Sequence, residues 1–303
     1  MNIDIVIVTF NRLEKLKYTL ECYEKQTITP RNIIVVNNNS SDGTKNYLDD
    51  WININSSFEK HIINLDDNIG GSGGFYEGQK YALGLNPDWV MLADDDAYPA
   101  VNMIEEFVKF VSSHNTNNTA AICAEVLRTD GSIDTSHRSR YHLVKGLFYE
   151  RTRSRYEDYN NEWFNIDLLS YVGCFLKREA LIEKGLVNPD YFIYSDDSEH
   201  SIRLKKYGEI ICVPAIKIIH DEQFAKQIDT LTWKDYYGYR NEIDMLKRHH
   251  FIAAITWTRR QLKLLKHFPE KKKVYKVAMK DAWFGRLGKH SIYKPGWTCE
   301  KKQ

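Results

Sequence analysis

The sequence lacks any apolar run near the roughly 20 residues that a membrane-spanning helix requires. Its first residues, Met1 to Asp4, lack the basic stretch and apolar core of a signal peptide. Its five cysteines are odd in number and form no CxxC pair, which argues against a zinc knuckle or a disulfide framework. The formal net charge is only +1, so bulk charge indicates no anionic partner. We expect reduced thiols and a cytoplasmic protein, either soluble or peripheral on the inner face of the cell membrane.

The composition is that of a folded globular protein. Of the 303 residues, 43% are apolar and 27% are charged, as in ordinary soluble domains. The length suits one large α/β domain with an appendage, or two small domains. Aromatic residues reach 13%, with 19 Tyr and 7 Trp. Aromatic rings stack on sugars, but they also fill protein cores, and core packing is the more common use.

Strand and helix patterns alternate through the first hundred residues. Apolar, β-branched runs cover residues 3–10, 33–36, 61–65 and 89–93, and helical spacing follows each of the first three. This order predicts an α/β fold with a doubly wound, mostly parallel sheet flanked by helices. Ligands of such sheets bind beyond the carboxyl ends of the strands. We therefore expect three polar clusters to converge there: residues 10–12, the turn from Asn37, and Asp94 to Asp96.

The second half of the sequence has a looser pattern. Further strands are expected near 121–127, 169–177 and 210–213, with a helix at 199–207. Residues 137–163 are polar, basic and aromatic without clear periodicity, and they predict a long loop over the site. Beyond about residue 228 the chain is helical and basic, including 236–248 and 258–267. We divide the chain into a catalytic domain, 1–227, and a helical C-terminal region, 228–303.

The acidic triplet Asp94-Asp95-Asp96 is the first cluster that indicates chemistry. Adjacent carboxylates repel one another, and a divalent cation relieves that repulsion. Mg²⁺ and Mn²⁺ prefer carboxylate oxygens and commonly bridge them to phosphates. A solvated turn or a helix N-cap is the alternative interpretation. The position at a strand end favours the metal site.

The glycine-rich segment from Asn68 to Gly74 is neither a Walker loop nor a GxGxxG fingerprint. Its glycines allow the backbone to approach a ligand closely, and the helix that follows offers N–H groups to a phosphate or sugar. A plain flexible turn is the alternative.

A second acidic cluster, Asp196-Asp197 with Glu199, lies about one hundred residues later. A carboxylate there could remove the proton from an attacking hydroxyl. Acidic residues are also common at helix N-termini, where the helix dipole favours them. His220 ends an apolar run, where it suits either a metal ligand or a structural role.

Together these motifs resemble glycosyltransferase family 2, whose members have the GT-A fold. The resemblance covers roughly residues 3–222 and rests on four segments, Val8 to Arg12, Val35 to Thr44, Asn68 to Gly71 and Asp94 to Asp96. It implies a donor site that contains Thr9, Arg12, Asn38, Asn68, Gly70, Gly71, Asp94 and Asp95. Many members have an Asp at the position of Asn38, where it pairs with uracil.

The resemblance also implies the roles of the acidic clusters. Asp94, Asp96 and His220 would hold Mn²⁺ or Mg²⁺, and Asp197 would be the catalytic base of an inverting hexosyltransferase. The expected acceptor side contains Trp163, Tyr194, Asp196 and Glu199, with the two aromatic rings as candidates for stacking on a sugar.

The segment NIGGSGGF, the triplet, the acidic pair and the later histidine together resemble bacterial galactofuranosyltransferases. This implies UDP-galactofuranose as donor and a glycan or lipid-linked glycan of the cell surface as acceptor. Ser195 replaces the Trp that mycobacterial polymerases carry before the acidic pair, and their flanking domains are missing. We therefore expect an enzyme that forms a single linkage.

Related rhamnosyltransferases, which use dTDP-rhamnose, are the nearest alternative. A metal-dependent phosphohydrolase and a non-catalytic nucleotide-sugar-binding module are alternatives of other classes. No nucleic-acid partner is expected. The basic and aromatic residues of 257–297 suit an anionic membrane surface, a solvated helical cap or a homo-oligomer contact.

Overall fold

The computed structural model describes residues 1–222 and 231–299. Its main sheet has nine strands, in the order β3-β2-β1-β4-β11-β6-β12-β5, with β9 paired to β12. The strands are β1 (Ile3–Thr9), β2 (Asn32–Asn37), β3 (Glu59–Asn64), β4 (Trp89–Asp94), β5 (Ala97–Pro99), β6 (Thr119–Leu127), β9 (Phe164–Ile166), β11 (Cys174–Lys177) and β12 (Glu209–His220). Strands β1 to β4 are parallel to one another, and β11 runs antiparallel between β4 and β6.

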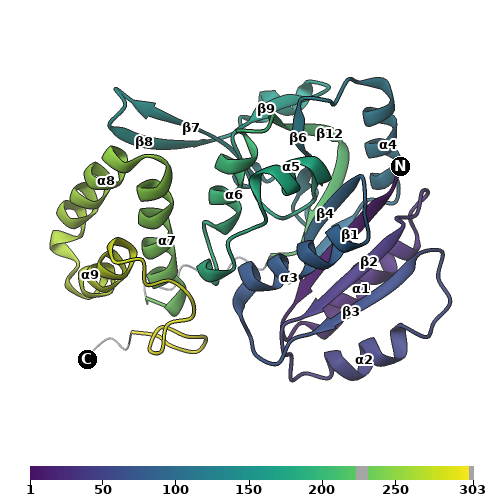
Figure 1. Ribbon diagram of the computed structural model, residues 1–303, viewed down its shortest axis with the longest axis horizontal. Helices are drawn as coiled ribbons and strands as arrows, with labels where there is room; N and C mark the ends of the chain where they lie inside the picture. The colour runs from purple at the N-terminus through teal and green to yellow at the C-terminus, as the bar shows by residue number, and fades with distance from the viewer. Residues whose placement is uncertain (223–230, 300–303) are drawn as a thin grey trace.

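Helices cover both faces of this sheet because its central strands are apolar on both faces (Figure 1). Along β1, Ile5 and Ile7 pack with one set of helices, and Val6 and Val8 pack with the other. The first set is α1 (Leu13–Glu24), α2 (Thr44–Trp51) and α4 (Met103–Ser113). The second set is α3 (Gly70–Gly84), α5 (Arg178–Lys184) and α6 (Asp196–Leu204). The predicted doubly wound, mostly parallel sheet is confirmed.

The glycine-rich segment forms the start of helix α3 itself, not a loop before it. Gly70 has a φ of +80°, and a Cβ there would lie 2.0 Å from the carbonyl oxygen of Phe192. Deeper in the helix, a Cβ on Gly74 would lie 2.6 Å from Val8 Cγ1. Several of these glycines are therefore needed because α3 packs closely against β1 and the loop at Phe192.

Replacing Gly78 by Ala should lower the free energy of unfolding by about 1–3 kcal/mol, the usual cost of overpacking a core. Its Cβ would lie 2.2 Å from Cγ1 of the buried Val6. Gly84, at the end of the same helix, has no atom within 4 Å of such a Cβ. Gly84→Ala should leave stability unchanged or raise it by up to about 1 kcal/mol. Urea denaturation measures both, and equal effects of the two variants would contradict the packing argument.

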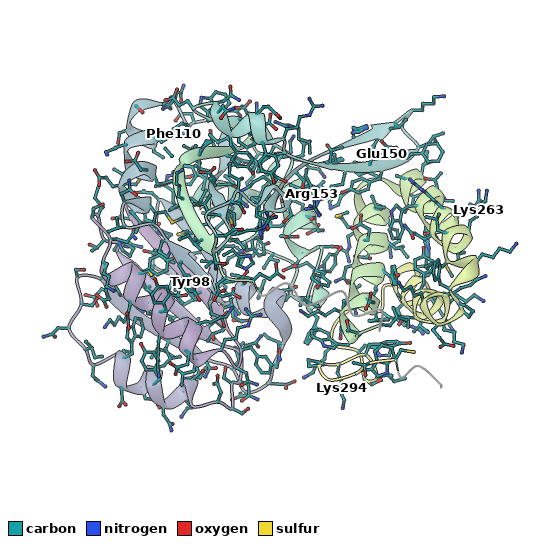
Figure 2. The ribbon with its side chains drawn as sticks, turned by 180° about the vertical axis from the view of Figure 1, so that it is seen from behind. Tyr98, Phe110, Glu150, Arg153, Lys263 and Lys294 are labelled. Atoms are coloured by element: carbon teal, nitrogen blue, oxygen red, sulfur yellow. The ribbon has the colours of Figure 1, made fainter. Side chains whose placement is uncertain are left out.

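Residues 137–163 form a β-hairpin, so the predicted long loop is wrong. Strands β7 (Arg138–Val144) and β8 (Phe148–Arg153) pair with each other and with β10 (Leu168–Leu169), and a short 3-10 helix covers Tyr156–Asn160. The hairpin extends toward helix α8, and Glu150 and Arg153 are labelled on it in Figure 2. Buried Tyr149 packs in one cluster with Met245 and Ala253 of the C-terminal helices. This tertiary contact stabilises strands whose sequence shows no clear alternation.

The C-terminal region is a helical appendage, as predicted. It contains α7 (Trp233–His249), α8 (Phe251–Leu264), a 3-10 helix (Leu265–His267) and α9 (Pro269–Trp283). The predicted boundary between residues 227 and 228 lies outside the described residues. Within 1–222 and 231–299, no helix has both the length and the apolar character needed to span a bilayer. All five cysteines are free thiols.

Candidate active site

The carboxyl ends of three parallel strands form one edge of the site. Thr9 at the end of β1 lies opposite Asn37 of β2, and Val8 lies opposite Asp94 of β4. The three polar clusters therefore come together, as the sequence predicted. They line a cavity of 260 Å³ that also contains residues of α3, of the loop at Phe192 and of the appendage. Every predicted donor-site residue lines it: Thr9, Arg12, Asn38, Asn68, Gly70, Gly71, Asp94 and Asp95.

Thr9 and Arg12 bind the acidic triplet directly. Thr9 Oγ1 donates to Asp95 Oδ2 at 2.8 Å. Arg12 Nη1 lies 3.1 Å from Asp95 Oδ1 and 2.6 Å from Asp96 Oδ2. Burial raises the pKa of Asp95 to about 6, although the Arg12 charge opposes that shift. Arg12 thus neutralises part of the negative charge of the triplet, and the contacts with Thr9 and Arg12 fix the Asp95 carboxylate in the cavity wall.

The buried side chain of Asn38 holds the turn that precedes α3. Its Nδ2 donates to the carbonyl of Gly70 at 2.9 Å, and its Oδ1 accepts from the backbone N–H of Ile69 at 2.9 Å. Asn68 Oδ1 accepts from the N–H of Gly70 at 2.8 Å in the same turn. Both ends of the Asn38 amide are therefore engaged, and the side chain shapes the cavity wall.

Asp94, Asp96 and His220 meet because the short strand β5 begins directly after the triplet. It pairs antiparallel with β12, which places Ala97 opposite His220. Tyr98 of β5, labelled in Figure 2, donates to Asp221 Oδ2 at 3.0 Å and joins the same two segments. One possible ligand atom from each of Asp94, Asp96 and His220 lies within 4.8 Å of the others. The predicted cluster is thus present in the fold.

Three observations indicate that Asp94, Asp96 and His220 suit a divalent cation. Two carboxylate oxygens and an imidazole nitrogen are ligands that Mn²⁺ accepts, and Mg²⁺ favours the carboxylates. Asp96 Oδ1 is buried and has no hydrogen-bond partner among the described residues; His220 Nε2 lies 3.4 Å away. Burial, followed by the neighbouring charge of Asp96, raises the pKa of Asp94 to about 7. A bound cation would give the buried Asp96 oxygen a partner and would stabilise the ionised form of Asp94.

A second cavity of 550 Å³ adjoins the first and shares Arg12, Gly71, Asp94 and Ile193 with it. Asp94, Asp96 and His220 line it together with the acidic pair Asp196-Asp197, which begins α6. Tyr194 also lines this cavity and is 46% exposed. The candidate cation ligands and the candidate base therefore share one cavity, the arrangement on which the predicted chemistry depends.

The two carboxylates of the acidic pair are desolvated. Burial, followed by the charge of Asp197, raises the pKa of Asp196 to about 7. Burial also raises the pKa of Asp197, although the nearby Arg151 charge opposes the shift. Ser198 N–H donates to Asp197 Oδ1 at 2.5 Å and fixes the orientation of the carboxylate. Raised pKa values are typical of groups that take up a proton near neutral pH.

The loop that presents the acidic pair is strained and is held by the appendage. Phe192, Tyr194 and Ser195 all have φ between 60° and 67°, a region that non-glycine residues rarely occupy. The fully buried Asn241 of α7 places its Nδ2 2.8 Å from the carbonyl of Ile193 and 2.9 Å from those of Tyr191 and Tyr194. Helix α7 is therefore part of the framework that orients Asp197.

Arg151 and Glu242 also line the second cavity, and the sequence did not single them out. Arg151 comes from β8, and its Nη1 donates to Ser198 Oγ at 3.4 Å. Glu242 comes from α7, accepts from Ser195 Oγ at 3.4 Å, and has its pKa raised by burial. No sequence signal distinguishes these two side chains from the many charged residues on solvated faces.

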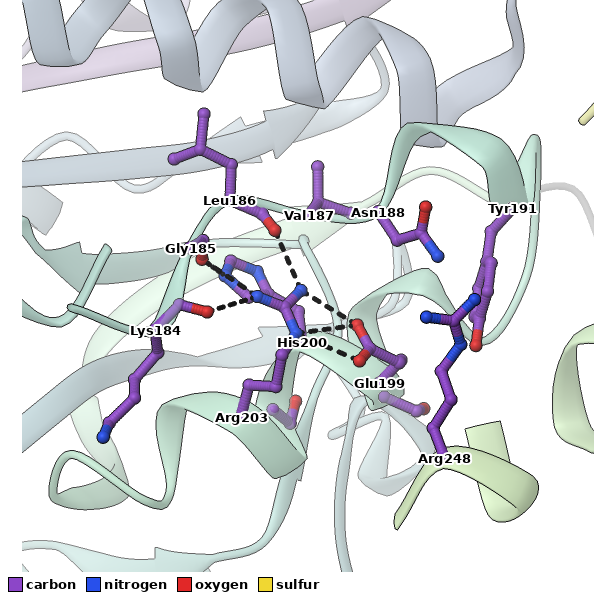
Figure 3. Close-up of polar contacts among 12 residues, drawn as sticks. Lys184, Gly185, Leu186, Val187, Asn188, Tyr191, Glu199, His200, Arg203 and Arg248 are labelled. Atoms are coloured by element: carbon purple, nitrogen blue, oxygen red, sulfur yellow. Dashed lines mark hydrogen bonds and ion pairs between the residues drawn. The ribbon is translucent and has the colours of Figure 1, made fainter. Parts of the chain in front are cut away.

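Glu199 and Trp163, both predicted on the acceptor side, do not line this cavity. Figure 3 shows Glu199 paired with Arg203, whose guanidinium also donates to the carbonyls of Gly185 and Leu186. Arg203 Nη2 lies 2.8 Å from Glu199 Oε2, and His249 Nε2 lies 2.9 Å from Oε1. Burial opposes ionisation, but these two partners lower the pKa of Glu199 to about 2. The carboxylate therefore has a structural role, in an ion pair with Arg203 within α6 and a hydrogen bond with His249 of α7.

Comparison with known proteins identifies related chains and folds. The family model described as glycosyl transferase family 2 matches residues 4–185. Galactofuranosyltransferase GlfT1 of Mycolicibacterium smegmatis is 26% identical over 208 residues, which are 67% of this chain and 65% of that protein. The uncharacterized glycosyltransferase YwdF of Bacillus subtilis is 29% identical over 229 residues, 73% of this chain and 74% of that protein.

Among solved structures, a crystal structure of GalNAc-T7 with UDP, GalNAc and Mn²⁺ is similar to this chain. Its TM-score is 0.65 at 16% identity, and the similarity covers 94% of this chain and 57% of that one. The chain thus spans less than two thirds of either protein, 65% of GlfT1 and 57% of GalNAc-T7. At this identity the likeness establishes a common fold.

Proposed function

The chain belongs to glycosyl transferase family 2, and on this premise we propose that it transfers a sugar from a nucleotide diphosphate donor to a hydroxyl, with inversion. The single observation that carries the proposal is the shared cavity of 550 Å³, where Asp94, Asp96 and His220 lie with Asp197. The adjoining cavity of 260 Å³, lined by Thr9 and Asn38, is the proposed place for the nucleoside.

In the proposed reaction, Asp197 removes the proton from the acceptor hydroxyl, and the oxygen attacks the anomeric carbon from the face opposite the diphosphate. One displacement inverts the anomeric configuration and needs no protein nucleophile. Asp94, Asp96 and His220 would hold Mn²⁺ or Mg²⁺, and the cation would supply charge neutralisation to the diphosphate leaving group. The positive charge of Arg12, beside Asp95 and Asp96, adds to the field at the same place.

The proposed donor is UDP-galactofuranose. The segment NIGGSGGF, the triplet, the acidic pair and the later histidine support it together with the similarity to GlfT1. GalNAc-T7 binds UDP in a related fold. The proposed acceptor is a glycan or lipid-linked glycan of the bacterial cell surface, reached from the cytoplasmic side of the membrane. Tyr194 on the cavity rim offers a ring for sugar stacking, and Asp196 lies next to the base.

A panel of nucleotide sugars tests the donor assignment. With Mn²⁺ present, UDP-galactofuranose should raise the melting temperature more than UDP-galactopyranose or dTDP-rhamnose, because at equal concentration the ligand that binds more tightly stabilises the native state more. Differential scanning fluorimetry measures the shifts. A larger shift with dTDP-rhamnose would favour the rhamnosyltransferase alternative, and no shift with any nucleotide sugar would contradict the proposal.

A further inference from the structure

Positive charge is concentrated in the helical appendage. Residues 247–294 contain 14 Lys and Arg but only Glu270 and Asp281 as acids, whereas the whole chain has a formal net charge of +1. The remainder of the chain is therefore acidic overall. Although the total charge is near zero, the positive charge is gathered at one end of the molecule. Such a separation of charge orients a protein toward an anionic surface.

Within the appendage, the charge is densest where α8 turns into α9. We define residues 259–273 as the basic tip; it holds seven Lys and Arg and one acid, Glu270. Lys273 Nζ pairs with Glu270 Oε1 at 2.9 Å. Among the described residues, no ion pair neutralises Arg259, Arg260, Lys263 or Lys266, and all four are exposed. The tip lies on the side of the molecule away from β1 to β3 in Figure 1, and Figure 2 shows Lys263 at its edge.

Two large apolar side chains are exposed among these cations. Leu264 at the end of α8 is 56% exposed, and Phe268 just before α9 is 54% exposed. Lys271 Nζ lies 5.6 Å from the centre of the Phe268 ring. Exposed leucine and phenylalanine do not stabilise a helical region that is surrounded by water. They can insert into the interface of a bilayer whose anionic headgroups attract the surrounding lysines.

We propose that the basic tip docks the protein on an anionic lipid membrane, with Leu264 and Phe268 inserted below the headgroups. The exposed Leu264 favours lipid over a nucleic acid, which would contact the cations and an aromatic ring but offers no apolar interior to an aliphatic side chain. Docking of this kind brings the chain to a lipid-linked acceptor at the membrane surface. The test below uses neither donor nor acceptor, so its outcome is independent of the proposed reaction.

The experiment measures sedimentation of the full chain with vesicles of phosphatidylglycerol and phosphatidylcholine in equal parts. Lys263→Glu combined with Lys266→Glu should weaken binding by about tenfold or more, since each Lys or Arg near an anionic membrane multiplies the partition coefficient several-fold. Leu264→Ser combined with Phe268→Ser should also weaken binding, with no change of charge. Lys45→Glu combined with Lys80→Glu changes the charge equally on α2 and α3 and should bind as the unaltered protein does.

Thermal unfolding of each variant verifies that it is folded. Equal binding by the Lys263/Lys266 variant and the unaltered protein would overturn the proposal. So would equal binding to pure phosphatidylcholine vesicles, because the attraction is electrostatic. Binding to a DNA duplex as tight as binding to the anionic vesicles at the same salt would show a general polyanion surface and would overturn the lipid assignment.

Discussion

Replacement of Asp197 by Asn is expected to reduce kcat for sugar transfer by about 10²–10⁴-fold, the usual contribution of a general base. The amide keeps the shape of the side chain and its hydrogen bond from the Ser198 N–H, but it cannot accept the hydroxyl proton. Donor binding should be unchanged, because Asp197 lines the second cavity and not the one proposed for the nucleoside. Calorimetry with the nucleotide sugar and a transfer assay separate the two effects.

Asp50→Asn, an exposed substitution on α2, serves as the matched control and should retain full activity. The pH profile gives a second readout for Asp197. Burial raises its pKa, so the carboxylate takes up a proton at a higher pH than an exposed aspartate. As the pH decreases, kcat/KM should therefore begin to fall at a higher pH than an ordinary aspartate would give. This acid-side fall should be absent from the residual activity of Asp197→Asn. Turnover near that of the unaltered protein would remove Asp197 from the role of base.

Removal of divalent cations with EDTA is expected to abolish transfer, and Mn²⁺ or Mg²⁺ should restore it. Without a cation, the carboxylates of the cluster repel one another: burial and Asp96 raise the pKa of Asp94 to about 7. Asp96 Oδ1 also has no hydrogen-bond partner among the described residues. His220→Ala removes one of three protein ligands and should raise the Mn²⁺ concentration needed for half-maximal activity by at least about tenfold.

His142→Ala supplies the matched control, since this exposed histidine lies on the hairpin outside the cluster. Its Mn²⁺ requirement should equal that of the unaltered protein. Titration of Mn²⁺ against melting temperature gives a readout that does not depend on turnover: stabilisation by Mn²⁺ should be lost in His220→Ala and kept in His142→Ala. Full transfer activity in excess chelator would contradict the metal site.

The part of the site built from strand ends was predictable from sequence. Thr9, Asn38 and Asp94 follow apolar runs, and the parallel alignment of those runs places them at one edge. His220 was placed by its position after a strand and by family resemblance. The contact that brings it to Asp96 depends on the three-residue strand β5, which is too short to leave a periodic pattern.

Other features depend on packing between distant segments and could not be predicted. The glycines of α3 suggested a loop because their close contacts with Val6 and Val8 of β1 are invisible in the local sequence. The hairpin at 138–153 is stabilised by α7 and α8, not by its own alternation. Arg151 and Glu242 are single charges on a strand and a helix, and only the fold turns them toward Asp197. Glu199 looked like a ligand of substrate because Arg203 and His249 could not be assigned as its partners.

The hydrogen bonds of Asn241 limit how this protein can be divided. The family match ends at residue 185, yet the peptide groups that aim Asp197 are secured from residue 241 of the appendage. A chimera that grafts residues 1–222 onto a foreign helical partner would keep the sheet and the cation ligands but release the strained loop. The smallest transplantable unit that keeps this loop in place therefore extends through α7, and the orientation of the proposed base cannot be separated from the appendage.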